Sequence, residues 1–333
     1  MPNSHLAYGL RINSNCDVPG LPAADGSGVG DVEVHLNDGM KFPESSNSEF
    51  FYSSENIDHS GRPLLRVGRL NDGAYGFFYG DGARFAVDRD GRRVIADWPT
   101  GYSLEDASTY LMGPVLAFVL RLRGLVCLHA SAVIIEDRAI ALVGSAGAGK
   151  STTSAVLAKN GYAVLSDDVV ALVEQGPCFR VQPGYQRVNL WPDSVRALFG
   201  AEEALPPVTP TWGKRYLELG QGRFRFESRT LPLGLIYVLR SRGAERSACR
   251  IDSIPPPLAI TTLVANTYLN YLLDKEMRSK EFRVLGRLVN SVALRSVEAP
   301  DDASRLDEVG EVIAADAKKA FASSFSAHSA ATC

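Results

Sequence analysis

The segment Gly144–Ser151 constrains this chain more than any other part of the sequence. It reads Gly-Ser-Ala-Gly-Ala-Gly-Lys-Ser and matches the pattern G-x-x-x-x-G-K-S/T in full. Glycines let such a loop curl so that its N–H groups point at one centre, which favours a phosphate group. Apolar residues precede the loop at 139–143, and a helical sequence follows at 150–159. This context predicts a buried strand that feeds a helix, whose N-terminal end adds positive charge to the loop.

The predicted ligands are ATP and Mg²⁺, and they follow from positions within this loop. Lys150 is placed to reach the β- and γ-phosphates, and the Ser151 hydroxyl is a hard oxygen ligand suited to magnesium. The predicted nucleotide-binding residues are Gly144, Ser145, Ala146, Gly147, Ala148, Gly149, Lys150, Ser151 and Thr152.

Two adjacent carboxylates, Asp167 and Asp168, end the next predicted strand, 163–166. On the assumption that strands 139–143 and 163–166 are parallel neighbours, their carboxyl ends share one edge of the sheet beside the loop. Adjacent strand residues point to opposite faces, so the two carboxylates are predicted to act differently. One would organise magnesium and the other would take the proton of an acceptor hydroxyl. The alternative is a solvated turn that carries two charges.

His129 is the third candidate. A tight turn at Glu136-Asp137 would pair Ile134 with Ala139, and the same register carried onward sets His129 opposite the first loop glycine. An imidazole there could donate to phosphate or serve the proton path. The alternative is a core histidine whose hydrogen bonds are satisfied by the backbone.

Three segments together resemble a known family. The runs 128–131 (Leu-His-Ala-Ser), 142–151 and 161–168 are similar, in order and spacing, to the catalytic domain of HPr kinase/phosphorylase, a bacterial serine kinase with a phosphoenolpyruvate-carboxykinase-type P-loop core. Residues 189–194 and 213–216 look closer to HPr-kinase-like proteins of ribosomal-peptide gene clusters, including kinases that phosphorylate the C-terminal serine of lasso peptide precursors.

The resemblance implies a role for each candidate residue. Asp167 would be the general base for a serine hydroxyl, Lys150 and Ser151 would hold phosphate and magnesium, and His129 with Asp168, the second metal ligand, would support them. A separate inference concerns Lys214 and Arg215. A basic residue in this polar segment could close over the transferring phosphoryl group as a phosphate clamp, although a solvated pair of charges is the alternative.

The expected fold class is α/β (α+β), with a P-loop core, a mixed sheet and a β-rich N-terminal region. Residues 1–100 show alternating apolar strands separated by turns and predict an antiparallel layer, a candidate for peptide recognition by strand addition. Residues 101–320 are predicted to be the kinase domain, with a helix at 103–122 and an α-rich part from about 258, and 321–333 a flexible tail.

The composition of the chain argues against some partners and locations. The net charge of −3 gives no reason to expect a nucleic-acid partner, and no apolar run approaches the length of a membrane span. Five scattered cysteines without a CxxC pair predict reduced thiols and a cytoplasmic protein. The expected partner is a peptide or protein with an accessible serine, and the resembling family forms homo-oligomers. Two other functions stay open: a P-loop ATPase or nucleotide switch, and a kinase of a small hydroxylated molecule.

Overall fold

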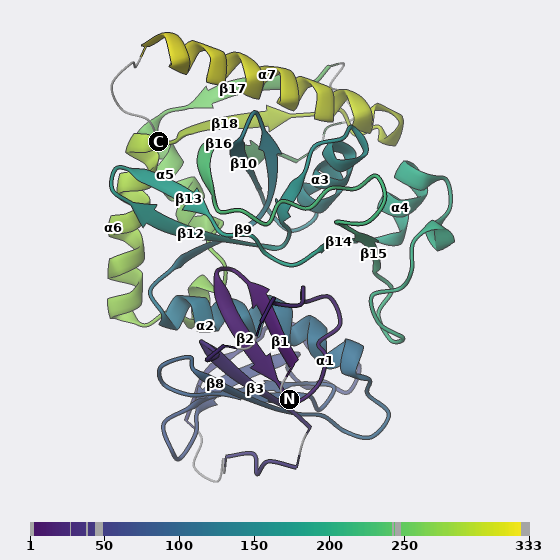
Figure 1. Ribbon diagram of the computed structural model, residues 1–333, viewed down its shortest axis with the longest axis vertical. Coiled ribbons are helices and arrows are strands. Elements are labelled where there is room, and N and C mark those ends of the chain that lie inside the picture. The colour runs from purple at the N-terminus through teal and green to yellow at the C-terminus, as the bar shows by residue number, and fades with distance from the viewer. Residues whose placement is uncertain are drawn as a thin grey trace. The chain divides into compact units, whose positions relative to one another are not determined.

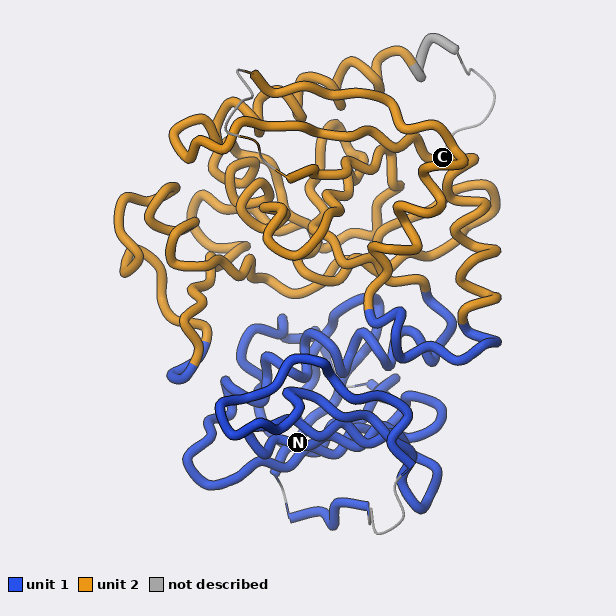
Figure 2. The backbone as a smooth tube through the Cα atoms, turned by 180° about the vertical axis from the view of Figure 1, so that it is seen from behind, with its two compact units in different colours: residues 1–125, 209–211, 269–277 blue, residues 126–208, 212–268, 278–333 orange. Residues whose placement is uncertain are grey.

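The structure is a computed structural model that describes residues 3–26, 28–37, 39–43, 49–241, 243 and 248–327 (Figure 1). The chain divides into two compact units, coloured separately in Figure 2. Unit 1 comprises residues 1–125, 209–211 and 269–277, and unit 2 comprises residues 126–208, 212–268 and 278–333. The helical residues after 100 thus group with the β-rich part of the chain. The predicted division into functional domains stays a prediction.

Unit 1 is built on one sheet with the strand order β1-β2-β3-β8-β7-β6-β5-β4. Its pairings are antiparallel except that β3 lies parallel to both β2 and β8. The expectation of a purely antiparallel layer is therefore wrong at β3, because long connections rather than tight turns lead into and out of that strand. The strands are β1 (Asn3–Ala7), β2 (Leu10–Ser14), β3 (Val32–Leu36), β4 (Glu49–Ser53), β5 (Leu65–Arg69), β6 (Tyr75–Tyr79), β7 (Arg84–Val87) and β8 (Arg93–Asp97).

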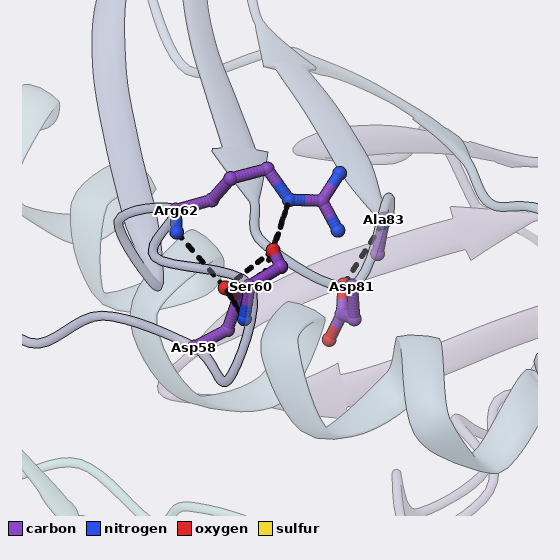
Figure 3. Close-up of polar contacts among 5 residues, drawn as sticks. All are labelled: Asp58, Ser60, Arg62, Asp81 and Ala83. Atoms are coloured by element: carbon purple, nitrogen blue, oxygen red, sulfur yellow. Dashed lines mark hydrogen bonds and ion pairs between the residues drawn. The ribbon is translucent and has the colours of Figure 1, made fainter.

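Carboxylates in the turns of this sheet bond to the backbone of their own turns (Figure 3). The predicted hairpin of β6 and β7 forms, and at its tip Asp81 Oδ1 accepts a hydrogen bond from the Ala83 N–H at 3.0 Å. In another turn, Asp58 Oδ1 accepts from the N–H of Ser60 at 2.8 Å, from the Ser60 hydroxyl at 2.7 Å and from the N–H of Arg62 at 2.9 Å. The Ser60 hydroxyl and the Arg62 N–H lower the pKa of Asp58 to about 2.

The predicted helix at 103–122 is confirmed, with an irregular middle. Ser103 caps α1 (Leu104–Tyr110) through a reciprocal capping box with Asp106. The chain then passes through a π-helical turn, η1 (Leu111–Val115), into α2 (Leu116–Leu122). Pro114 lies in η1 and has no N–H to donate, which accounts for the local departure from α-helical bonding.

Unit 2 holds the predicted loop and the carboxylates. Its main sheet has the order β10-β9-β12-β13-β16-β18-β17, with β11 paired to β9 and a further pairing of β10 with β16, and a separate ribbon joins β14 to β15. The strands are β9 (Val126–Ile135), β10 (Arg138–Val143), β11 (Val164–Ser166), β12 (Val169–Gln175), β13 (Cys178–Val181), β14 (Arg187–Leu190), β15 (Arg215–Glu218), β16 (Leu231–Leu239), β17 (Arg250–Ile254) and β18 (Ala293–Glu298).

Strand β9 is shared between different neighbours. Its first half pairs with β12, and its second half pairs with β10 on one side and β11 on the other. Both β10 and β11 are antiparallel to β9, so they run in the same direction but are not neighbours. The assumption that they are adjacent parallel strands is therefore wrong. Their carboxyl ends still reach the same edge of the sheet, because one intervening antiparallel strand leaves their directions equal.

Helices cover both faces of this sheet (Figure 1). Ile140 and Leu142 of β10 point into the core packed by α3, α4 and α7, whereas Ala139, Ala141 and Val143 point into the core packed by α5 and α6. Burial on both faces explains the continuous apolar run before the loop. The helices are α3 (Lys150–Lys159), α4 (Pro192–Phe199), α5 (Pro256–Ala265), α6 (Lys275–Ser291) and α7 (Leu306–Ala327), with single turns η2 (Glu202–Ala204), η3 (Asn270–Leu272) and η4 (Ala303–Arg305).

The expectation of a mixed α/β fold is met, with helices and several sheets. The helical part after 258 also contains β18, which the sequence analysis missed and which lies parallel to β16. Helix α7 ends at Ala327, and residues 328–333 of the predicted tail lie outside the described residues. Cys178 is disulfide-bonded, so the expectation that all cysteines are reduced is wrong for this residue. Within the described residues, no helix has the length and apolarity needed to cross a membrane.

Candidate active site

The loop between β10 and α3 has a backbone that only glycine readily adopts at key points. Gly149, with φ of 93°, is the residue before α3, and no side chain caps the helix there. At Gly144, with φ of 155°, a Cβ would lie 2.7 Å from the carbonyl oxygen of Leu239. The N-terminal end of α3 is therefore left with backbone N–H groups that a bound anion can satisfy.

Lys150 folds back over this loop. Its Nζ donates to the carbonyl oxygens of Gly144 at 2.8 Å and Ser145 at 3.2 Å, and the residue is only 8% exposed. Burial lowers the pKa of Lys150, and the nearby carboxylates of Asp168 and Asp167 act in the opposite direction. The ammonium group is thus held at the start of the loop, close to both aspartates.

The hairpin register that sequence reasoning predicted is confirmed. β10 and β9 pair Ala139 with Ile134 and continue without a bulge to Val143 opposite Ala130. His129 is the next residue of β9, so it lies at the level of the loop, where it pairs with Val169 of β12. Its side chain is 39% exposed, and its Nε2 lies 3.4 Å from Asp168 Oδ1. The interpretation of His129 as a core histidine does not hold, because its imidazole contacts a carboxylate at the surface.

Asp167 is enclosed, with 1% exposure. Its Oδ1 accepts from the Ser131 hydroxyl at 2.6 Å and its Oδ2 accepts from the N–H of Asn189 at 3.1 Å. The Ser151 hydroxyl lies near enough to this carboxylate to act against the rise in its pKa. Burial raises the pKa of Asp167, and the charge of Asp168 adds to this, although the Ser131 hydrogen bond opposes it. Both carboxylate oxygens therefore have partners from the chain itself.

Asp168 differs from its neighbour in both exposure and partners. Its side chain is 36% exposed, and its backbone has φ of 67°, in the left-handed region that aspartate tolerates better than most residues. Tyr268 donates its hydroxyl to Asp168 Oδ2 at 3.0 Å. Burial acts to raise the pKa of Asp168, but contact with His129 and the charge of Lys214 outweigh it and the pKa lies below its usual value. The turn thus sends the two carboxylates into different surroundings.

The two basic candidates separate in the structure. Lys214 lies near enough to Lys150 and Asp168 to influence the pKa of each, and its Nζ lies 5.0 Å from the centre of the Trp191 ring. Arg215 begins β15, opposite Leu190 of β14, and its Nε is buried without a hydrogen-bond partner among the described residues. Lys214 is therefore grouped with the loop and the aspartates.

Three contributors to this site escaped sequence reasoning: Ser131, Asn189 and Tyr268. Ser131 is two residues beyond His129 on β9, so the alternation along the strand could have indicated it. Asn189 acts through its backbone, which carries no signal in the side chain. Tyr268 arrives from the segment after α5, where its N–H donates to the Cys127 carbonyl and its ring lies edge-on to His129 with centroids 5.3 Å apart. No local pattern predicts that approach.

The donor set suits magnesium better than a transition metal. No group of three or more His, Cys, Asp or Glu side chains that could hold a metal occurs among the described residues. Magnesium is commonly held by one or two carboxylates together with substrate phosphates and water, so a hydroxyl and a carboxylate beside the loop are enough. Ser151 and Asp167, whose side chains are near enough for the hydroxyl to influence the pKa of the carboxylate, offer that combination.

Comparisons with known proteins do not assign this chain to a family. No family model matches the chain, and no curated protein matches it. Among solved structures, the Hpr(Ser) kinase/phosphatase from Coxiella burnetii aligns with 61% of this chain and 99% of its own, at 14% identity and a TM-score of 0.30. A TM-score this low does not establish a common fold, so the function must be inferred from the site itself.

Proposed function

We propose that this chain is an ATP- and Mg²⁺-dependent kinase that transfers the γ-phosphoryl group to a serine hydroxyl of a peptide or protein. The observation that carries the proposal is the gathering of one lysine, two carboxylates and an imidazole at the mouth of a glycine-rich strand-to-helix loop. Phosphoryl transfer needs mainly such positioned charges and one proton acceptor.

The surroundings of the two aspartates favour a division of roles opposite to the one that the family resemblance implies. Asp167 is enclosed and both its oxygens are engaged, so it is poorly placed to touch an acceptor. Asp168 is partly exposed, lies beside His129 and is held by Tyr268. We therefore assign the base role to Asp168 and the metal-organising role to Asp167 with Ser151.

The acceptor hydroxyl gives its proton to the Asp168 carboxylate, and its oxygen attacks the γ-phosphorus of ATP. The bond between that phosphorus and the oxygen bridging to the β-phosphate breaks, and ADP leaves with the electron pair. Lys150, with Lys214 near enough to influence its pKa, would screen the negative charge on the transferring group, and Mg²⁺ held by Ser151 and Asp167 would supply further charge neutralisation.

The acceptor that we propose is the C-terminal serine of a peptide such as a lasso peptide precursor. The support is in two sequence segments that carry the narrower resemblance, 189–194 and 213–216. They lie side by side, because β14 pairs Asn189 with Tyr216 and Leu190 with Arg215. Trp191 is 61% exposed and lies beside Lys214, which is near enough to Lys150 to influence its pKa. An exposed aromatic ring beside a cation offers a surface for a peptide segment.

The test is transfer of labelled γ-phosphate from ATP, with Mg²⁺, to a synthetic peptide that ends in serine. We expect phosphoserine in the product by mass spectrometry, and a loss of roughly 10²-fold or more in Lys150→Met. Lys319→Met removes an exposed lysine of α7 and is the matched control. Steady release of inorganic phosphate with no labelled peptide or small hydroxylated acceptor would instead indicate the ATPase or nucleotide-switch alternative.

A further inference from the structure

A cavity of about 350 Å³ adjoins the loop within unit 2. One wall is the end of β16 with Arg240, and another is the loop at Gly144 and Ser145. The third is formed by Thr262 and Ala265 of α5 and by Asn266, directly after that helix. This volume is at the lower end of the range for small-molecule sites, so the cavity suits a single residue or a small compound rather than a folded domain.

The cavity borders the end of the loop at which the transferable phosphoryl group would lie. The lysine of such a loop reaches the β- and γ-phosphates, and here Lys150 Nζ donates to the carbonyls of Gly144 and Ser145, the same two loop residues that line the cavity. An occupant would therefore meet the γ-phosphate rather than the nucleoside.

The α5 wall also leads directly to the proposed base. The carbonyl oxygen of Asn266 accepts from the N–H of His129 at 2.8 Å, so this wall abuts the strand that carries the imidazole. Two residues later, Tyr268 donates to Asp168. One short segment, 266–268, thus connects the cavity to the proton acceptor.

The cavity lining combines apolar residues with hydroxyl and amide side chains, and it carries one cation. Thr262 donates its hydroxyl to the Leu258 carbonyl at 2.8 Å, and Asn266 donates its amide to the Thr262 carbonyl at 2.8 Å. The oxygens of both side chains can still accept hydrogen bonds. Arg240 is exposed, and within the described part of the chain it has no carboxylate partner. These groups suit an occupant with hydroxyl or N–H donors and an anionic group.

We propose that this cavity is the acceptor pocket, and that Arg240 binds a carboxylate close to the acceptor hydroxyl. The inference rests on the proposed kinase function and adds to it the place and the recognition chemistry of the acceptor. A hydroxyl with a nearby carboxylate is offered both by the end of a peptide chain and by a free hydroxylated amino acid. The source must be distinguished by experiment.

The experiment uses the full chain with three probes: a peptide that ends in serine, the same peptide with a C-terminal amide, and L-serine. Ala265→Phe fills the cavity from an exposed position on α5, and Ala322→Phe makes the same change on the exposed face of α7. Arg240→Gln removes the cation, and Arg283→Gln removes an exposed arginine of α6 as its control. Affinity for ATP is measured in parallel by equilibrium binding.

We expect Ala265→Phe to lower kcat/KM for the preferred acceptor roughly tenfold or more. ATP affinity should change little, because the larger side chain would occupy the acceptor cavity and not the nucleotide site. We expect Arg240→Gln to raise KM for the free-acid probe by about tenfold and to leave the amide probe unchanged. Preference for the peptide over L-serine, or the reverse, identifies the source of the hydroxyl.

Other outcomes overturn the inference in recognisable ways. Weaker ATP binding in Ala265→Phe, with unchanged acceptor KM, would make the cavity a nucleoside site. Equal use of acid and amide probes by the unmodified protein, or binding of ATP without use of any of the three probes, would remove the carboxylate from the recognition. Failure of the unmodified protein to bind ATP would refute the kinase proposal itself, which is a different result.

Discussion

Carboxylates in the two units are held in contrasting ways. In unit 1, Asp58 accepts hydrogen bonds from Ser60 and Arg62, and among the described residues it has no hydrogen-bond donor farther than four positions away. In unit 2, Asp167 is held by Ser131, 36 residues earlier, and Asp168 is held by Tyr268, 100 residues later. The first arrangement stabilises a turn and needs nothing else. In the second arrangement, the carboxylates gain their partners only when distant parts of unit 2 fold together. Such tertiary contacts can shift the pKa and fix the orientation of a carboxylate, as a reactive site requires.

Asp81 lies between these extremes. Its Oδ1 bonds to its own turn, while its Oδ2 accepts from the Tyr102 hydroxyl at 2.7 Å and from the Tyr110 hydroxyl. A carboxylate with distant partners can therefore be purely structural. The partners of Asp168 differ because they include a titratable imidazole and leave the carboxylate 36% exposed.

The largest effect is expected for Asp168→Asn. An amide cannot take the proton of the acceptor, so kcat should fall by roughly 10² to 10⁴-fold while ATP affinity is kept. Asp167→Asn should instead weaken Mg²⁺-dependent ATP binding. Transfer kinetics and equilibrium nucleotide binding on both variants separate the two roles. Normal transfer by Asp168→Asn would return the base role to Asp167, as the family resemblance implies.

Asp81→Ala should destabilise unit 1 by about 2 kcal/mol, because the half-buried Tyr102 and Tyr110 hydroxyls lose their acceptor. Denaturant unfolding measures this free energy. Tyr102→Phe should lower the free energy of unfolding by less, because the Tyr102 hydroxyl is removed and Tyr110 keeps Asp81 as its acceptor. An unchanged midpoint in Asp81→Ala would mean that these contacts contribute nothing in solution.

Tyr268→Phe should lower kcat by roughly tenfold and leave the KM for ATP near its normal value. The variant keeps the ring against His129 and removes the hydroxyl that donates to Asp168. Steady-state kinetics with the serine-ending peptide provides the measurement. An effect on ATP binding alone would show that Tyr268 does not position the base.

The smallest effect is expected for Asp58. Its folded pKa of about 2 lies below its ordinary value of 3.8, so its contribution to stability is present above about pH 4 and is lost as the pH falls toward 2. NMR titration of the carboxyl carbon measures the pKa directly. In Ser60→Ala the value should move back toward 3.8, and an unshifted pKa in the unmodified protein would contradict the turn geometry.

The sequence predicted those parts of the site that depend on neighbours in the chain. The limits of α3, the strand before it and the register of β9 against β10 all follow from local pattern and one tight turn. It did not predict that β9 separates β10 from β11, because several strand orders bring the same carboxyl ends together. Nor did it predict Tyr268, whose approach depends on where α5 ends.

The sharing of β9 has a consequence for how activity is lost. His129 and Ser131 stand two residues apart on that strand, one against each aspartate. If the pairing of β9 is lost, Asp168 and Asp167, the proposed proton acceptor and the proposed magnesium ligand, both lose a contact in one event. Mild urea should then abolish the proposed transfer activity at the concentration at which amide protons of β9 begin to exchange, before bulk fluorescence reports denaturation.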